Sequence, residues 1–199
     1  FIPPQQQPVI INPESGRLWT ANARTVGGET YQLLGNGGYD LGARNKQIRD
    51  GLMVLQQADE QALHQIQLDN RALLLQRWQQ LLLETLTPEL ISNHQLQEYR
   101  QYIVQSSHHA STDAVGYTLV KAFREQVLQT LFSPLSAYLE RYGARSQDLK
   151  YPLETPGWAM LQHRRDDTLP PQYENWDEFL LAAVLTSKQK LEQQTGSLS

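Results

Sequence analysis

The chain has no cysteine, no long apolar run and no basic stripe. The lack of cysteine excludes disulfides, thiolate metal sites and a cysteine nucleophile. No apolar run approaches the roughly 18 residues needed to span a bilayer, so we expect no membrane span. The formal net charge is −4, and the densest basic cluster, His163-Arg164-Arg165, is followed directly by two aspartates. Nucleic acid is therefore not an expected partner. The start, Phe1-Ile2-Pro3-Pro4, does not resemble a signal peptide, so we expect any targeting segment to lie outside the chain.

The first forty residues differ in pattern from the rest. The β-prone run Pro8-Val9-Ile10-Ile11 stops at the turn-rich cluster Asn12–Gly16, and Arg17–Ala21 resumes an extended alternation. This pattern predicts a β hairpin. A glycine-rich stretch follows, with Gly27-Gly28 and Gly35-Asn36-Gly37-Gly38. It lacks both the Lys-Ser/Thr and the spacing of a phosphate loop, so we do not expect nucleotide binding.

From Arg44 onward, apolar residues recur at helical spacing. The expected helical faces are Ile48, Leu52 and Leu55; Leu63, Ile66, Leu73, Leu74, Trp78, Leu81 and Leu82; Leu96, Tyr99 and Ile103; and Val120, Phe123, Val127, Leu131, Leu135, Tyr138 and Tyr142. The expected helix starts are Thr87-Pro88-Glu89, Ser111-Thr112-Asp113 and a point near Trp176, with a kink at Ser133-Pro134. The sequence predicts a mainly α fold with a short N-terminal β hairpin, that is, α+β. Its expected parts are a hairpin and Gly-rich loop over 1–43 and a helical domain of five or six helices over 44–199, with a Pro-rich loop region at 143–175.

Several residues with chemical potential have simpler structural interpretations. The histidines lack metal-ligand spacing, so surface or capping roles are favoured. Ser15 lies in a turn rather than in a G-x-S-x-G elbow. Asp69 interrupts an apolar pattern, and capping or pairing with Arg71 or Arg77 is favoured over catalysis.

Asn22 has two interpretations. It ends a β-prone run and precedes a flexible glycine-rich loop, a place where site residues often lie. Its amide can donate to an anionic oxygen without carrying charge itself. Alternatively, it is a turn asparagine that tolerates a left-handed backbone. On local features alone the turn role is favoured.

One segment resembles the penicillin acylase family of N-terminal nucleophile amidohydrolases. That family has Asn/Asp-Pro-x-x-Gly-x-Ile/Leu followed by Thr-Ala-Asn; here the same pattern is Asn12-Pro13-Glu14-Ser15-Gly16-Arg17-Leu18 followed by Thr20-Ala21-Asn22. Later blocks are also similar and stand in the family's order. They are Tyr39, Gly42 and Arg44, then Gln67-Leu68-Asp69, Ser111-Thr112-Asp113 with Tyr117, Phe123 and Arg124, and Pro170–Trp176.

The resemblance implies a mechanism and two site residues. A serine at the N-terminus of the family's large chain attacks an amide carbonyl, its own α-amine acts as base, and the enzyme is acylated. By the match, Asn22 is the oxyanion asparagine, and Arg44 has an orienting and charge-balancing role; an ion pair at a helix start is the structural alternative for Arg44. The implied fold is part of an αββα hydrolase, made by autoproteolysis and located in the periplasm or secreted. The implied partners are a small acyl amide substrate and the rest of its own precursor, meaning the small chain and the segment that bears the nucleophile.

The chain departs from the family in places. Residue 1 is Phe rather than Ser, so we expect an internal fragment of the large chain that is inactive alone. We expect no cofactor in this fragment. Calcium is possible in the full-length enzyme, but the ligand position expected here falls near Leu33, which has no ligand atom. The alternative from another functional class is a non-catalytic helical binding or scaffold domain.

Overall fold

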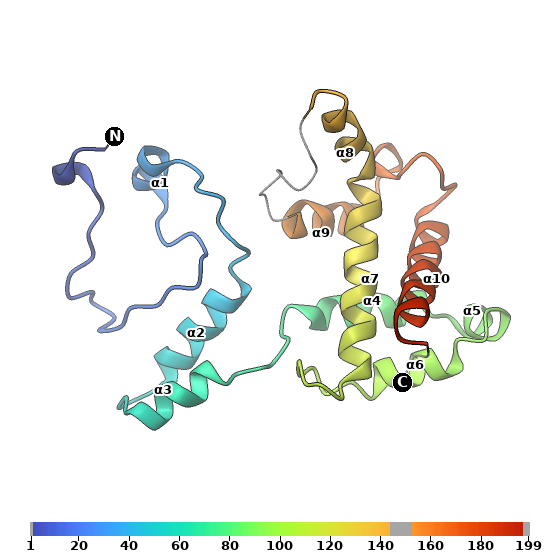
Figure 1. The fold of residues 1–199 in the computed structure, drawn as a ribbon, viewed down its shortest axis with the longest axis horizontal. Helices are drawn as coiled ribbons and strands as arrows, with labels where there is room; N and C mark the ends of the chain where they lie inside the picture. The colour runs from blue at the N-terminus through green and yellow to red at the C-terminus, as the bar shows by residue number, and fades with distance from the viewer. Residues whose placement is uncertain (1, 144–152, 197–199) are drawn as a thin grey trace. The chain divides into compact units, whose positions relative to one another are not determined.

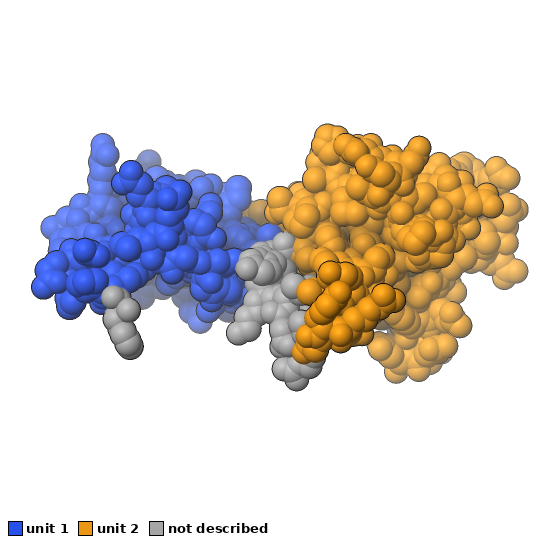
Figure 2. Space-filling model, turned by 90° about the horizontal axis from the view of Figure 1, so that it is seen from above, with its two compact units in different colours: residues 1–69, 149–152 blue, residues 70–148, 153–199 orange. Residues whose placement is uncertain are grey.

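The computed structural model describes residues 2–143 and 153–196, which form two compact units (Figure 2). Unit 1 comprises the described residues up to Asp69, and unit 2 comprises those from Asn70 onward. The division falls later than the boundary expected at 43/44, because helices α2 (Ala43–Val54) and α3 (Glu60–Gln67) pack against each other. Gly51 of α2 permits this approach, since a Cβ there would lie 3.2 Å from Ile66 of α3.

The described residues of unit 1 do not form the expected hairpin. Among its described residues the β pairing is one isolated parallel bridge, between Ala23 and Asp40. The side chains of Val9, Ile10 and Ile11 stay exposed. A two-stranded hairpin is only marginally stable by itself, and the Arg17 side chain binds the end of α2 instead.

The glycine-rich stretch forms a short helix that the sequence pattern did not predict. Helix α1 (Gly28–Leu34) ends at Gly35, whose φ of 72° lies in the left-handed region and whose N–H donates to the Tyr31 carbonyl. Glycine at this position is a common way to end a helix, because it takes up a positive φ without steric cost. Unit 1 begins with a 3₁₀ turn, η1 (Pro4–Gln6).

Unit 2 is helical, and helix α7 packs against α10, α6 and α4 (Figure 1). Its helices are α4 (Leu75–Thr85), α5 (Pro88–Asn93), α6 (Gln97–Val104), α7 (Val115–Leu131), α8 (Ser133–Glu140), α9 (Glu154–His163), η3 (Asp166–Thr168) and α10 (Trp176–Thr195). Two expected helix starts are confirmed. Thr87 Oγ1 accepts from Leu90 N at 3.3 Å, and Asn175 Oδ1 accepts from Glu178 N at 2.8 Å. Each contact satisfies a first-turn N–H that has no partner within its helix.

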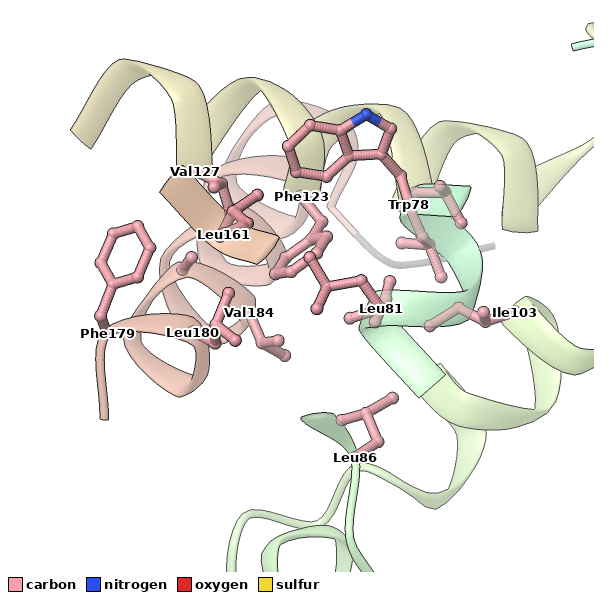
Figure 3. Packing of buried hydrophobic residues seen from close by; sticks show 14 of the residues in the cluster. Trp78, Leu81, Leu86, Ile103, Phe123, Val127, Leu161, Phe179, Leu180 and Val184 are labelled. Carbon is pink, nitrogen blue, oxygen red and sulfur yellow. The ribbon is translucent and has the colours of Figure 1, made fainter. Parts of the chain in front are cut away.

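The core of unit 2 lies where the helical spacing placed it. Trp78 and Phe123 are fully buried, with their rings edge to face at 6.3 Å between centroids (Figure 3). The α7 stripe from Val120 to Leu131 is also buried, and each large apolar side chain contributes about 1.5–3 kcal/mol on burial. Leu135, Tyr138 and Tyr142 continue the spacing but are exposed. The helical face changes direction there because α7 ends at Leu131 and a new helix, α8, begins at Ser133 with Pro134, which has no N–H to donate, in its first turn.

Three other expectations need correction. The pattern from Leu63 to Leu82 is two helices rather than one, because the segment between α3 and α4 pairs with residues 108–110: Ala72 N donates to His108 O, and Ala110 N donates to Asn70 O. The expected cap at 111–113 is absent: α7 has Ala114 as its N-cap, without a side-chain hydrogen bond.

The Pro-rich region at 143–175 also differs from the expected loop. It contains α9 and η3, and Pro156 sits in the first turn of α9, where a missing N–H leaves no helix bond unmade. Residues 144–152 of that region lie outside the described part. None of the described helices is both long and apolar enough to cross a membrane.

Candidate functional site

The backbone of Asn22 is held in a left-handed conformation at the end of the segment that begins at Arg17. Its φ is 61°, a value that asparagine tolerates better than most residues. The Asn22 carbonyl accepts from Asp40 N at 2.9 Å, and the neighbouring Ala23 is buried. The backbone therefore agrees with the turn interpretation. Because the side chain is exposed, the turn role does not conflict with a chemical role.

Arg44 binds the side chain of Asn22. This arginine is the second residue of α2, and its Nη2 donates to Asn22 Oδ1 at 2.8 Å and to Ala21 O at 3.2 Å. Arginine has only donors, so the amide atom that faces it must be the oxygen. The Nδ2 group of Asn22 is thereby left as the donor end of the amide, and in the described part of the chain it makes no hydrogen bond. The structure thus brings together the two predicted site residues, and Arg44 binds two neutral oxygens rather than forming the ion pair considered as its alternative.

Other residues of the quoted motifs support this pair. Gly42 is the N-cap of α2 and its carbonyl accepts from Lys46 N, so the helix that carries Arg44 starts at a fixed point. The ring of Tyr39 lies 6.4 Å from that of Tyr31 on α1, and Arg24 lies over the Tyr31 ring at 4.8 Å. These contacts tie the glycine-rich loop to the segment that follows Asn22.

Asp69 has a hydrogen-bond partner that the sequence did not suggest. Its Oδ2 accepts from Gln47 Nε2 at 3.3 Å, so the residue that follows α3 is joined to α2. Arg77, one of the two partners considered for it, binds Glu154 instead. The Gln67-Leu68-Asp69 element therefore helps to hold α2 in place, and Asp69 is half-buried.

Glu154 is a buried carboxylate that sequence reasoning missed. Its side chain is 1 % exposed and accepts from Arg77 Nη2 at 2.5 Å, Trp78 Nε1 at 2.7 Å and Arg124 Nε at 2.6 Å. Burial alone would raise the pKa of Glu154, but these donors outweigh it and hold the pKa below the usual range. Two of the partners are 77 and 30 residues away, so no local pattern could have revealed the cluster.

The described residues offer no evident metal centre, since no three His, Asp or Glu side chains among them converge on one point. Leu33, the position where the resemblance would place a calcium ligand, is exposed on α1, and its hydrocarbon side chain does not fit that role. His109, one of the histidines considered for a ligand role, pairs with Asn70 at 2.6 Å.

Comparison with known proteins gives one match. The penicillin amidase family model matches residues 1–199, the whole chain. No curated protein and no solved structure gives a significant match. The family match agrees with the motif that ends at Asn22, and it indicates a hydrolase of the penicillin acylase type as the full-length protein. The chain belongs to the penicillin amidase family.

Proposed function

We propose that this chain is the part of an amidohydrolase that supplies the oxyanion donor, Asn22. The observation that carries the proposal is the contact made by the Asn22 amide: Arg44 holds its oxygen, which leaves the N–H group of this exposed side chain as the available donor. The backbone bond from Asp40 and the left-handed φ restrict where this donor can lie. A preorganised neutral donor of this kind stabilises charge that appears only in the transition state.

The reaction that uses such a donor is acyl transfer to a serine. In this proposal the nucleophile is the N-terminal serine of the family mechanism, contributed by another part of the protein. Its hydroxyl oxygen bonds to the amide carbon of a small acyl substrate while its α-amine takes the hydroxyl proton. The carbonyl oxygen becomes an anion next to Asn22 Nδ2. Collapse of this tetrahedral intermediate breaks the C–N bond, and the amine leaves with the proton that the α-amine had taken. Water then hydrolyses the acyl-enzyme by the same route.

The Arg44 guanidinium strengthens this donor in two ways. It fixes which end of the amide is the donor, and its positive charge close to Oδ1 polarises the amide so that the N–H donates more strongly. Arg44 is exposed, so its direct electrostatic effect on a distant charge is screened by solvent. In the proposal, the main role of Arg44 is therefore to orient the Asn22 amide, and the effect of its charge on that amide is secondary.

Replacing the Asn22 amide tests the proposal. In the full-length protein, assayed with a panel of acyl p-nitroanilides, Asn22→Ala is expected to lower kcat about 10²–10³-fold with little change in KM. Asn36→Ala is the matched control, because Asn36 lies in the glycine-rich stretch that follows Asn22 and, among the described residues, its side chain accepts only from the nearby Gly38 N–H. A loss below about threefold for Asn22→Ala, or no hydrolysis of any anilide by the unaltered protein, would favour the scaffold alternative.

A further inference from the structure

Arg17 binds the end of the helix that Arg44 begins. Arg17 Nε donates to Leu52 O at 2.8 Å, and its Nη2 donates to Leu55 O, the carbonyl of the C-cap of α2. Its Nη1 also donates to Ser15 O at 3.3 Å. The last carbonyls of a helix have no partner within the helix and carry its negative dipole end. A half-buried guanidinium is therefore a stabilising cap at this point.

Arg17 and Arg44 join residues 17–22 to α2, one at each end of the helix. At the start of α2, Arg44 reaches back to Ala21 and Asn22; at its end, α2 accepts Arg17, the residue that opens the same segment. A helix of 12 residues is about 18 Å long at 1.5 Å per residue. The five residue steps from Arg17 to Asn22 can span at most about 17–18 Å. The segment is therefore long enough to lie along the helix, and the two arginine contacts hold its two ends on α2.

The turn before Arg17 fixes the direction in which its side chain leaves the backbone. Gly16 has a φ of 64°, and its N–H donates to Pro13 O at 2.8 Å. Ser15 Oγ accepts from Arg17 N at 3.3 Å and lies 3.0 Å from Arg17 O. The motif from Asn12 to Asn22 is therefore a continuous support: a closed turn, an anchoring arginine, a connecting stretch and the donor amide.

We propose that Arg17 is a positioning residue for Asn22. By fixing the far end of the 17–22 segment on α2, it holds the Asn22 amide at one height along the helix, where Arg44 can bind its oxygen. Without this anchor, residues 17–22 can shift along α2 or away from it. The Asn22 N–H group then no longer lies at the position of the oxyanion, although every side chain of the site is still present. A misplacement of about 1 Å is enough to cost on the order of 100-fold in rate. This inference rests on the proposed function of Asn22.

A double-mutant cycle on the full-length protein tests the inference. Arg17→Met is expected to lower kcat on the acyl p-nitroanilides about tenfold with KM changed less than about twofold, because the Arg17 guanidinium is bound at the end of α2 and the proposal gives it no contact with substrate. In the Asn22→Ala background the same change is expected to have less than about a twofold effect, since the donor it positions is gone. Arg49→Met is the matched control, because it removes a guanidinium from α2 that, among the residues the structure describes, binds only the adjacent Asp50.

The outcomes separate the inference from the function on which it rests. If Asn22→Ala leaves kcat unchanged, the proposed function fails. If Asn22→Ala lowers kcat but Arg17→Met does not, or lowers it equally in both backgrounds, the positioning role is overturned while the function stands. Should Arg17→Met fail to fold, Arg17→Lys carries the same cycle. It keeps the charge at the helix end but loses the forked geometry, so a smaller loss of kcat that again disappears with Asn22→Ala supports the role.

Discussion

At the scale of single residues, the property of Asn22 that matters is the ability to donate. Arg44 holds the side-chain oxygen and would hold a carboxylate oxygen equally well. Aspartate also tolerates the left-handed φ of 61°. An aspartate at this position would therefore keep the shape, the backbone and the Arg44 contact, and would lose only the N–H group.

Asn22→Asp separates donation from structure. It should lower kcat of the full-length protein at least as much as Asn22→Ala, about 10²-fold or more, because it also places a negative charge beside the developing oxyanion. Its thermal midpoint should stay close to that of the unaltered protein. Asn36→Asp, which keeps the acceptor that binds Gly38 N, should change neither value. An Asn22→Asp protein with activity within threefold of normal would show that donation by this residue is not used.

At the scale of elements, the Glu154 cluster joins α9 to α4 and α7. Its oxygens accept from Arg77 and Trp78 of α4 and from Arg124 of α7, and Arg77 also stacks over Trp158 of α9 at 4.4 Å. A buried ion pair is weak evidence of net stability, but removing one partner leaves charge uncompensated and is costly. The cluster therefore fixes how these three helices meet.

Glu154→Gln should destabilise the full-length protein by about 3–5 kcal/mol, measured by urea unfolding followed by circular dichroism. Glu84→Gln, an equal charge change at an exposed site on α4, should cost little.

The dependence of the unfolding free energy on pH tests the same cluster in a second way. Because the folded pKa of Glu154 is lowered from 4.5, its contribution is present above that value and is lost as pH falls through the folded pKa. The Gln variant should lack this part of the acid dependence. Equal loss of stability with acid in both proteins would contradict this assignment.

Elements set by local chemistry were predictable from sequence, and those set by distant contacts were not. Thr87 caps a helix through a residue three positions away, α10 begins at the expected Trp176, and Val120 to Leu131 follow one helical stripe, so each was evident in the pattern. The prediction of a hairpin was wrong because the Arg17 side chain bonds to carbonyl groups 35 and 38 residues away, which no local pattern indicates. The motif singled out Asn22 and Arg44, but their mutual contact across 22 residues came only from the structure.

At the scale of the whole molecule, the two units differ in how much core they bury. Of the buried hydrophobic residues in the described part, Ala23 alone belongs to unit 1, whereas unit 2 holds the cluster around Trp78, Phe123 and Phe179. Burial of apolar surface is the main stabilising contribution to folding, so unit 2 has the means to fold by itself. Unit 1 relies mainly on hydrogen bonds at exposed and half-buried positions.

Limited proteolysis of the 199-residue chain, followed by mass spectrometry, should reveal this difference. Early cuts are expected within residues 2–69, leaving a resistant product that contains α4 to α7 and α10, because segments with few buried contacts open at low free-energy cost. The same segment should be protected in the full-length protein if the rest of the enzyme covers it. First cuts inside α7 or α10, with residues 2–69 intact, would contradict the assignment of the stable core.

The most direct measurement is a distance in the full-length protein with a phosphonate transition-state analogue bonded to its nucleophilic serine. The account predicts that Asn22 Nδ2 lies about 2.7–3.1 Å from the phosphonyl oxygen, with Oδ1 still bound by Arg44. A separation beyond about 3.6 Å, or an Asn22 amide that turns its oxygen toward the adduct, would contradict it.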